Sequence, residues 1–297
     1  MLNPHPGLPK FDYVKPASLD EASQFLAQHS GEARPFMGGT DCFVRMRDGF
    51  MKPAYMVDVK RLDGMNDISF DPIRGLTIGA AVPMNRVVAH PAIEENYALL
   101  AEAAKSVASF QLRTRATIVG NICNASPAGD TIGASLVYGG QLHVHGVDGD
   151  RDLPLDSFFT GPGRTVLKPG DIVTSISFPI PPAGGIGKYL KLGRNRLGDL
   201  SIVGVTVYGY ADLSSPSGYR FRIALASVGP TPLRAKAAEE ILANAPISED
   251  TIIAAAQAAM DTATPIDDVR GSARYRKYMV RNLTREGVTY VWNRIQA

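Results

Sequence analysis

Two segments of the 297-residue chain combine residue types that suit the binding of a large polar ligand. The first covers residues 36–41 (FMGGTD) and directly follows a predicted strand. Its consecutive glycines allow positive φ angles, so that successive backbone N–H groups can approach and bind an anion. Thr40 and Asp41 add side chains that form hydrogen bonds. A tight turn without a ligand is the alternative interpretation of this segment taken alone.

The second segment covers residues 117–130 (TIVGNICNASPAGD), in which polar side chains and glycines alternate with small residues. Small residues let the backbone approach a large ligand, and the hydroxyl and amide groups supply orienting hydrogen bonds. The carboxylate of Asp130 suits a ribose-type diol. A solvated surface loop, with Asp and Asn acting as caps, is the alternative here.

Several other kinds of site are not supported by the sequence. It contains no P-loop motif, no G-x-S-x-G motif and no G-x-G-x-x-G motif between a strand and a helix. His143 and His145 lie two apart on a predicted strand and would face the same side, but no third metal ligand is near, which favours a solvated strand face. Cys42 and Cys123 form no C-x-x-C pair, which excludes a four-cysteine cluster and fits a reducing cytosol.

The composition indicates an ordinary globular protein, with 45% apolar and 20% charged residues. Lys and Arg number 31 and Asp and Glu 29, so the net charge of +2 gives no case for nucleic-acid binding. No apolar run reaches 18 residues, which predicts no membrane span. Residues 1–16 lack the apolar stretch of a secretory signal, so we expect a cytoplasmic protein.

Local patterns predict an α+β fold. A capping box formed by Ser18 and Glu21 predicts a helix at 18–29, and good helix formers predict another at 92–109. The mixed composition of residues 111–130 indicates a functional loop. Strands are expected at 33–37, 55–59, 76–82, 141–147 and 171–180.

A domain boundary is expected near residue 180, where Pro179, Pro181 and Pro182 precede two glycines. Beyond it, alternating segments at 201–210 and 219–228 predict an antiparallel hairpin. Helices are then expected at 234–243, 249–262 and 281–295. The chain would thus form two packed parts, residues 1–180 and 181–297, each with sheets and helices.

Taken together, these motifs resemble the FAD-binding medium subunit of molybdenum hydroxylases, the xanthine dehydrogenase and carbon monoxide dehydrogenase family. The resemblance spans nearly the whole chain, and its pieces occur in the same order as in the family. The pieces are residues 11–16 (FDYVKP), 38–41 (GGTD), 113–130, 158–165 (FFTGPGRT), 167–173 (LKPGDIV), 189–194 (YLKLGR) and 198–203 (GDLSIV).

The resemblance implies a fold: a two-lobed FAD-binding domain of the vanillyl-alcohol-oxidase (PCMH) type at 1–180, with its lobes split near residue 58. A C-terminal domain of the molybdenum-hydroxylase flavoprotein type, an antiparallel sheet plus helices, would follow at 181–297. It also implies that the glycine loop binds the FAD pyrophosphate through backbone N–H groups. The implied FAD-binding residues are Pro35, Phe36, Met37, Gly38, Gly39, Thr40, Asp41, Cys42, Val107, Thr117, Ile118, Gly120, Asn121, Asp130, Val173, Tyr189 and Lys191.

One position departs from the family pattern, since Val119 stands where the family usually has a glycine. A β-branched residue would be strained there if the backbone adopted a positive φ. We therefore expect a local change of geometry at Val119 rather than a loss of FAD binding.

The resemblance further implies a function. The chain would hold non-covalent FAD, receive electrons from a 2Fe–2S small subunit that drains a molybdenum-cofactor large subunit, and pass them to an external acceptor. The assembly would be a dimer of heterotrimers, and we expect neither a catalytic side chain nor a metal in this chain. A stand-alone flavin-dependent oxidase or dehydrogenase of the same fold is the main alternative, and a cofactor-free scaffold is a second.

Overall fold

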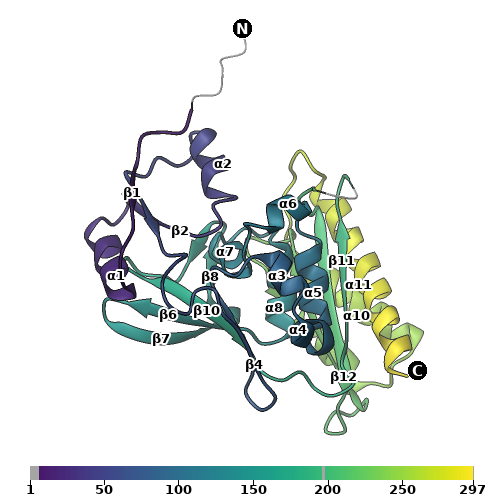
Figure 1. The fold of residues 1–297 in the computed structure, drawn as a ribbon. Helices are drawn as coiled ribbons and strands as arrows, with labels where there is room; N and C mark the ends of the chain where they lie inside the picture. Colours follow the sequence, from purple (N-terminus) through teal and green to yellow (C-terminus); the bar gives the residue numbers. More distant parts are fainter. Residues whose placement is uncertain (1–6, 196–197, 297) are drawn as a thin grey trace.

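The computed structural model describes residues 7–195 and 198–296, which form successive layers of sheet and helix (Figure 1). The first layer is a small parallel sheet in the order β1-β3-β2, flanked by two helices. Its elements are β1 (Asp12–Val14), α1 (Leu19–Gln28), β2 (Ala33–Phe36), α2 (Cys42–Arg47) and β3 (Tyr55–Asp58). The predicted cap at Ser18 is confirmed, because Ser18 Oγ accepts the Glu21 N–H. The Glu21 carboxylate accepts the N–H of Ala17, one residue before the cap, rather than that of Ser18 as a capping box would require.

The second layer is an antiparallel sheet of five strands in the order β4-β5-β10-β6-β7. The strands are β4 (Ile68–Asp71), β5 (Gly75–Gly79), β6 (Gln141–Gly146), β7 (Gly149–Pro154) and β10 (Ile172–Phe178), and η1 (Leu155–Ser157), β8 (Phe159–Gly161) and β9 (Arg164–Thr165) lie between β7 and β10. Side chains such as Ile78, Leu142 and Ile176 are buried on one face. The other face carries half-exposed polar residues, so the sheet has one packed side and one solvated side.

Six short helices lie between this sheet and the C-terminal sheet (Figure 1), and all of them except α6 contribute buried side chains to the same hydrophobic core as the five-stranded sheet. They are α3 (Met84–Val88), α4 (Pro91–Asn96), α5 (Ala98–Lys105), α6 (Phe110–Arg113), α7 (Ile118–Cys123) and α8 (Asp130–Val137). The single helix predicted at 92–109 is wrong, because the chain breaks at Tyr97. There the buried Tyr97 hydroxyl donates to the carbonyl of Pro179 at 3.0 Å, a long-range contact that local propensity does not contain.

The loop predicted at 111–130 is also wrong in part, since it contains α6 and α7. Thr117 caps α7, and its Oγ1 accepts the N–H of Gly120 at 2.9 Å. Val119 lies inside α7, is buried, and is not among the residues with positive φ. The strain expected at Val119 is therefore absent, because helical backbone suits a valine.

The last layers are an antiparallel sheet and three helices. The sheet comprises β11 (Ile186–Leu192), β12 (Val203–Ala211), β13 (Tyr219–Ala226) and β14 (Leu233–Arg234), and the predicted hairpin is confirmed as β12–β13. Helices α5 and α8 cover one face of this sheet, whereas α9 (Lys236–Asn244), α10 (Glu249–Thr262) and α11 (Ala273–Ile295) cover the other (Figure 1). Helix α11 begins earlier than predicted, at a cap formed by Ser272.

Within the two described stretches, no helix has both the length and the apolar character needed to cross a membrane. The sequence predicts no secretory signal in residues 1–16. Of these residues, 1–6 lie outside the part of the chain that the structure describes.

Candidate cofactor-binding cleft

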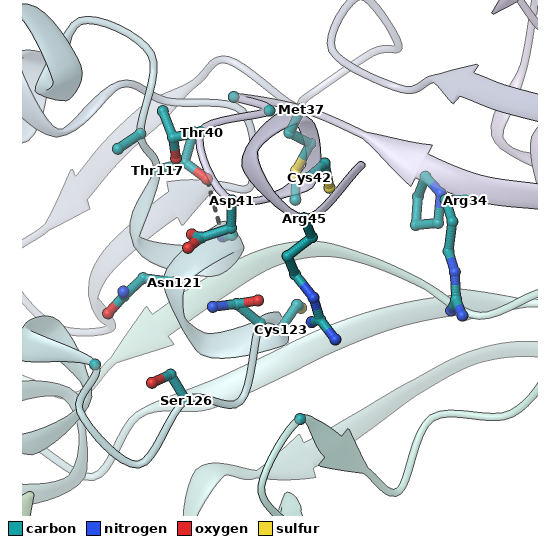
Figure 2. A pocket seen from close by; sticks show the side chains of 18 of the residues that line it. Arg34, Met37, Thr40, Asp41, Cys42, Arg45, Thr117, Asn121, Cys123 and Ser126 are labelled. Atoms are coloured by element: carbon teal, nitrogen blue, oxygen red, sulfur yellow. Dashed lines mark hydrogen bonds between the residues drawn. The ribbon is translucent and has the colours of Figure 1, made fainter. Parts of the chain in front are cut away.

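A cleft with a volume of about 710 Å³ lies beside the glycine loop (Figure 2). The loop between β2 and α2 lines it, as do residues of α7 and of the turn before α8. Residues from segments 163–171 and 198–200 also contribute to the lining. The cleft thus brings together residues of the two predicted ligand-binding segments, 36–41 and 117–130, although these segments lie some 80 residues apart in the chain.

The glycine loop offers unengaged backbone donors. Within the part of the chain that the structure describes, the four N–H groups of residues 38–41 donate to no other group. A Cβ atom at Gly38 would lie 2.1 Å from the carbonyl oxygen of Arg115, and one at Gly39, where φ is +75°, would lie 2.4 Å from the Phe36 ring. Only glycine fits both positions, and the free N–H groups suit an anionic ligand such as a pyrophosphate.

The second segment contributes side-chain groups from α7 and from the turn that follows it. Asn121 lines the cleft, and its Oδ1 accepts the hydroxyl of Thr131 at 2.7 Å. The Asn121 amide nitrogen has no partner among the described residues and can donate to a ligand. Asn121 and Ser126 lie on the α7 side of the cleft, across from Met37 and Asp41 (Figure 2).

Asp130 lies at the buried end of this segment, with 7% of its surface exposed. Its Oδ1 accepts the hydroxyl of Tyr189 at 2.7 Å, and its Oδ2 accepts Lys191 Nζ at 2.8 Å. Burial raises the pKa of Asp130, while the Lys191 charge acts in the opposite direction. Burial also raises the pKa of Tyr189 well above its usual value, and so does the Asp130 charge. Tyr189 and Lys191 therefore hold Asp130 in place.

The charges that line the cleft do not cancel. Asp130, Asp171 and Asp199 are each paired with a cation from outside the lining, namely Lys191, Arg151 and Arg194. The remaining lining charges are Arg34, Arg45, Lys168 and Asp41, and no ion pair joins them to one another or to other described residues. This leaves a surplus of two positive charges, which complements a ligand with two negative charges such as a diphosphate.

Two cysteines line the same cleft. Burial raises the pKa of the Cys42 thiol, and it raises the pKa of Cys123 to about 12. Both thiols are therefore protonated at neutral pH, the form that is poorly nucleophilic. No histidine occurs among the lining residues of the cleft. The residues thus fit a ligand held without a covalent bond.

The described residues contain no group of three or more His, Cys, Asp or Glu side chains that could hold a metal ion. His143 contacts Asp152 instead, and His145 lies between Asp20 and Asp150.

The structure brings most of the residues selected from the sequence to the cleft, but not all. Those that line it are Pro35, Met37, Gly38, Gly39, Thr40, Asp41, Cys42, Val107, Thr117, Gly120, Asn121 and Asp130. Phe36, Ile118 and Val173 are buried in the core next to it, whereas Tyr189 and Lys191 reach it through Asp130. Arg34, Arg45 and Lys168 also line the cleft but are not predictable from the sequence, because single cations outside a glycine-rich segment carry no local signal.

Comparison with known proteins identifies the family. Residues 9–181 match the family described as the FAD binding domain in molybdopterin dehydrogenase. Residues 188–291 match the family described as the CO dehydrogenase flavoprotein C-terminal domain. The chain therefore belongs to the family of molybdopterin-dehydrogenase flavoproteins, and the resemblance found in its motifs is confirmed.

Individual relatives agree with this assignment. The chain is 30% identical to the carbon monoxide dehydrogenase medium chain of Hydrogenophaga pseudoflava, over 96% of this chain and 98% of the relative. It is 27% identical to the xanthine dehydrogenase FAD-binding subunit of Escherichia coli O157:H7, over 93% and 94%.

Solved structures confirm the predicted α+β fold. A chain of the carbon monoxide dehydrogenase from Hydrogenophaga pseudoflava, solved without the Mo-pyranopterin moiety of its cofactor, superposes with a TM-score of 0.92 at 32% identity, covering 97% of this chain and 99% of that one. A chain of the reconstituted CO dehydrogenase from Oligotropha carboxidovorans gives a TM-score of 0.91 at 26% identity, with the same coverage.

Proposed function

We propose that this chain is the FAD-binding electron-transfer subunit of a molybdenum-containing hydroxylase or dehydrogenase. It would receive electrons from a 2Fe–2S subunit and pass them to an external acceptor. The observation that carries the proposal is the cleft itself: free backbone N–H groups of residues 38–41 and a surplus of positive charge line one cleft in a chain of this family.

The residues of the cleft would bind and orient the cofactor. The N–H groups of residues 38–41 would donate to the pyrophosphate, and Asn121 and Asp130 would form hydrogen bonds with its polar groups. When bound, FAD supplies the redox chemistry, which belongs to the cofactor rather than to any side chain. The protonated state of both lining thiols supports non-covalent binding.

The partners are part of the same proposal: a molybdenum-cofactor large subunit and a 2Fe–2S small subunit, assembled as a dimer of heterotrimers. The relatives support it, since one is named a medium chain and another a FAD-binding subunit, which implies further chains. We place the complex in the cytoplasm, as the two free cysteines suggest.

We also propose the domain limits 1–180 and 181–297, with a split of the first domain near residue 58. The two family matches support the main boundary, because one ends at residue 181 and the other begins at residue 188. The end of β3 at Asp58, where the small parallel sheet is complete, supports the split.

Purification of the tagged chain from its native host, followed by metal analysis, tests the proposed subunit role. We expect FAD, iron and molybdenum to copurify with it, together with two further chains. The isolated recombinant chain should bind FAD but oxidise no substrate of the native complex when an artificial acceptor is supplied. Sustained turnover by the isolated chain, without iron or molybdenum, would instead establish the stand-alone oxidase.

A further inference from the structure

The solvated face of the five-stranded sheet carries a Ser–His–Asp arrangement formed by three neighbouring strands. Ser177 lies on β10, His143 on β6 and Asp152 on β7. Ser177 Oγ lies 2.8 Å from His143 Nε2, and His143 Nδ1 lies 2.6 Å from Asp152 Oδ1. Both distances are within hydrogen-bonding range. The contacts use the same ring atoms as the catalytic triads of serine hydrolases.

The chemistry of the three groups fixes the direction of both hydrogen bonds. An ionised Asp152 carboxylate can only accept, so His143 Nδ1 must donate to it. In the neutral ring, Nε2 is then the acceptor and takes the hydrogen bond from the Ser177 hydroxyl. This is the tautomer in which a histidine removes the proton of a serine.

Strand register places two side chains with N–H or O–H donors beside the serine. Ser177 is directly opposite Thr77 on β5 and directly opposite Gln141 on β6. Directly opposed residues of an antiparallel pair project from the same face of the sheet, with Cβ atoms about 5 Å apart. Neither the Thr77 hydroxyl nor the Gln141 amide has a hydrogen-bond partner among the described residues. Both groups can therefore donate to an oxygen that becomes negatively charged next to Ser177.

The arrangement is open to solvent and separate from the cofactor cleft. The His143 side chain is 35% exposed and that of Asp152 54% exposed, so a small molecule can reach the group. None of the residues around Ser177 lines the cleft. His145, the second histidine on this face, differs because a carboxylate faces each of its ring nitrogens, and so it activates no hydroxyl.

We propose that Ser177 is a nucleophile that accepts acyl groups from small activated carboxylic esters. Ser177 Oγ forms a bond to the acyl carbon, and the bond from that carbon to the alcohol oxygen of the ester breaks. His143 Nε2 takes the serine proton and returns it to the departing alkoxide or phenolate, while Asp152 holds the ring in the required tautomer. The exposed setting restricts the substrates to esters with a small acyl group and a good leaving group.

Incubation of the purified full-length protein with p-nitrophenyl acetate tests this proposal. We expect a burst of p-nitrophenolate equal to about one per chain. Peptide mapping by mass spectrometry should place the acetyl group on Ser177. The His143→Gln variant should slow this acetylation by about 100-fold, as expected for loss of a general base. Gln141→Ala should slow it by about tenfold, because it removes one of the two oxyanion donors.

Ser175→Ala is the matched control, because Ser175 lies two residues earlier on the same face, opposite His143, and forms no side-chain hydrogen bond among the described residues. In the Ser175→Ala variant, Ser177 should become acetylated at the same rate as in the unaltered protein. Flavin content and circular dichroism, measured on each variant, test whether the fold is intact. Acetylation confined to lysines, or acetylation of Ser177 at an unchanged rate in His143→Gln, would overturn the proposal.

Discussion

At the scale of single residues, the motif around Asp130 indicated a role in cofactor binding, but it did not reveal what holds the carboxylate. Its partners Tyr189 and Lys191 are 59 and 61 residues further along the chain. They lie on β11, one strand of a sheet whose packing against α8 cannot be read from local sequence. The family resemblance implied all three residues one by one, whereas the structure shows that Tyr189 and Lys191 both bind the Asp130 carboxylate.

The Asp130→Asn variant should weaken FAD binding by about 1–3 kcal/mol. Asparagine keeps the shape of the side chain, but it leaves the Lys191 ammonium group without its counter-charge in a largely buried position. Fluorescence titration of the apoprotein with FAD measures the effect. Asp63→Asn is the control, because Asp63 is exposed and forms no ion pair among the described residues. Equal dissociation constants for the two variants would contradict the role of Asp130.

Gly39→Ala should reduce FAD affinity at least tenfold, because the added Cβ would force the loop to move away from the Phe36 ring. Gly31→Ala is a matched control. Gly31 also lines the cleft and has a φ of +87°, but a Cβ there would meet nothing within 4 Å. Both variants carry backbone strain of about 1–2 kcal/mol, visible in urea unfolding. If Gly31→Ala lost as much flavin affinity as Gly39→Ala, backbone strain, rather than close approach to the Phe36 ring, would explain why residue 39 must be glycine.

At the scale of secondary-structure elements, the sequence predicted long and strongly patterned segments well. The hairpin β12–β13 and helices α1 and α10 lie where they were expected. Helix α7 was missed because threonine, valine, glycine and asparagine disfavour helix locally. Burial of Ile118, Val119 and Ile122 stabilises it instead, and such tertiary packing is not visible in a local pattern.

The start of α11 depends on a buried charge. Arg276, in its first turn, is 2% exposed and donates to Asp268 and to the carbonyl of Ser227. Hydrogen bonds from Arg270, and then from Arg276, hold the pKa of Asp268 well below its usual range. A lowered pKa means that the unfolded chain binds more protons than the folded one near pH 4, so that folding stability falls as the pH falls.

We therefore expect Asp268→Asn to lower the free energy of unfolding by about 3 kcal/mol at pH 7, because Arg276 would keep a buried charge without its partner. The loss should shrink as the pH falls below about 4, where protonation of Asp268 in the unfolded chain cancels its contribution. Urea unfolding of both proteins between pH 3 and pH 7 measures this. A difference that stayed constant over that range would show that the Asp268 charge contributes nothing.

At the scale of the whole molecule, family motifs predicted the two-part architecture, and hydrophobic patterning predicted many of its elements. The order of the layers was not predictable, since it depends on contacts between distant segments. Gly187 contacts Leu99, and Gly133 contacts Thr206, where a Cβ would lie 2.7 Å and 2.3 Å from the neighbouring side chain. Such close approaches hold α5 and α8 against the C-terminal sheet, and thereby place Tyr189 and Lys191 beside the cleft.

The residues of the cleft fit one FAD held without a covalent bond. The most direct measurement is the flavin content of the purified chain saturated with FAD and then precipitated with acid. The structure predicts about one FAD per chain before precipitation and all of it in the supernatant afterwards, because both lining cysteines are protonated thiols. A chain that takes up no FAD, or flavin that stays with the precipitated protein, would rule out non-covalent FAD binding in the cleft.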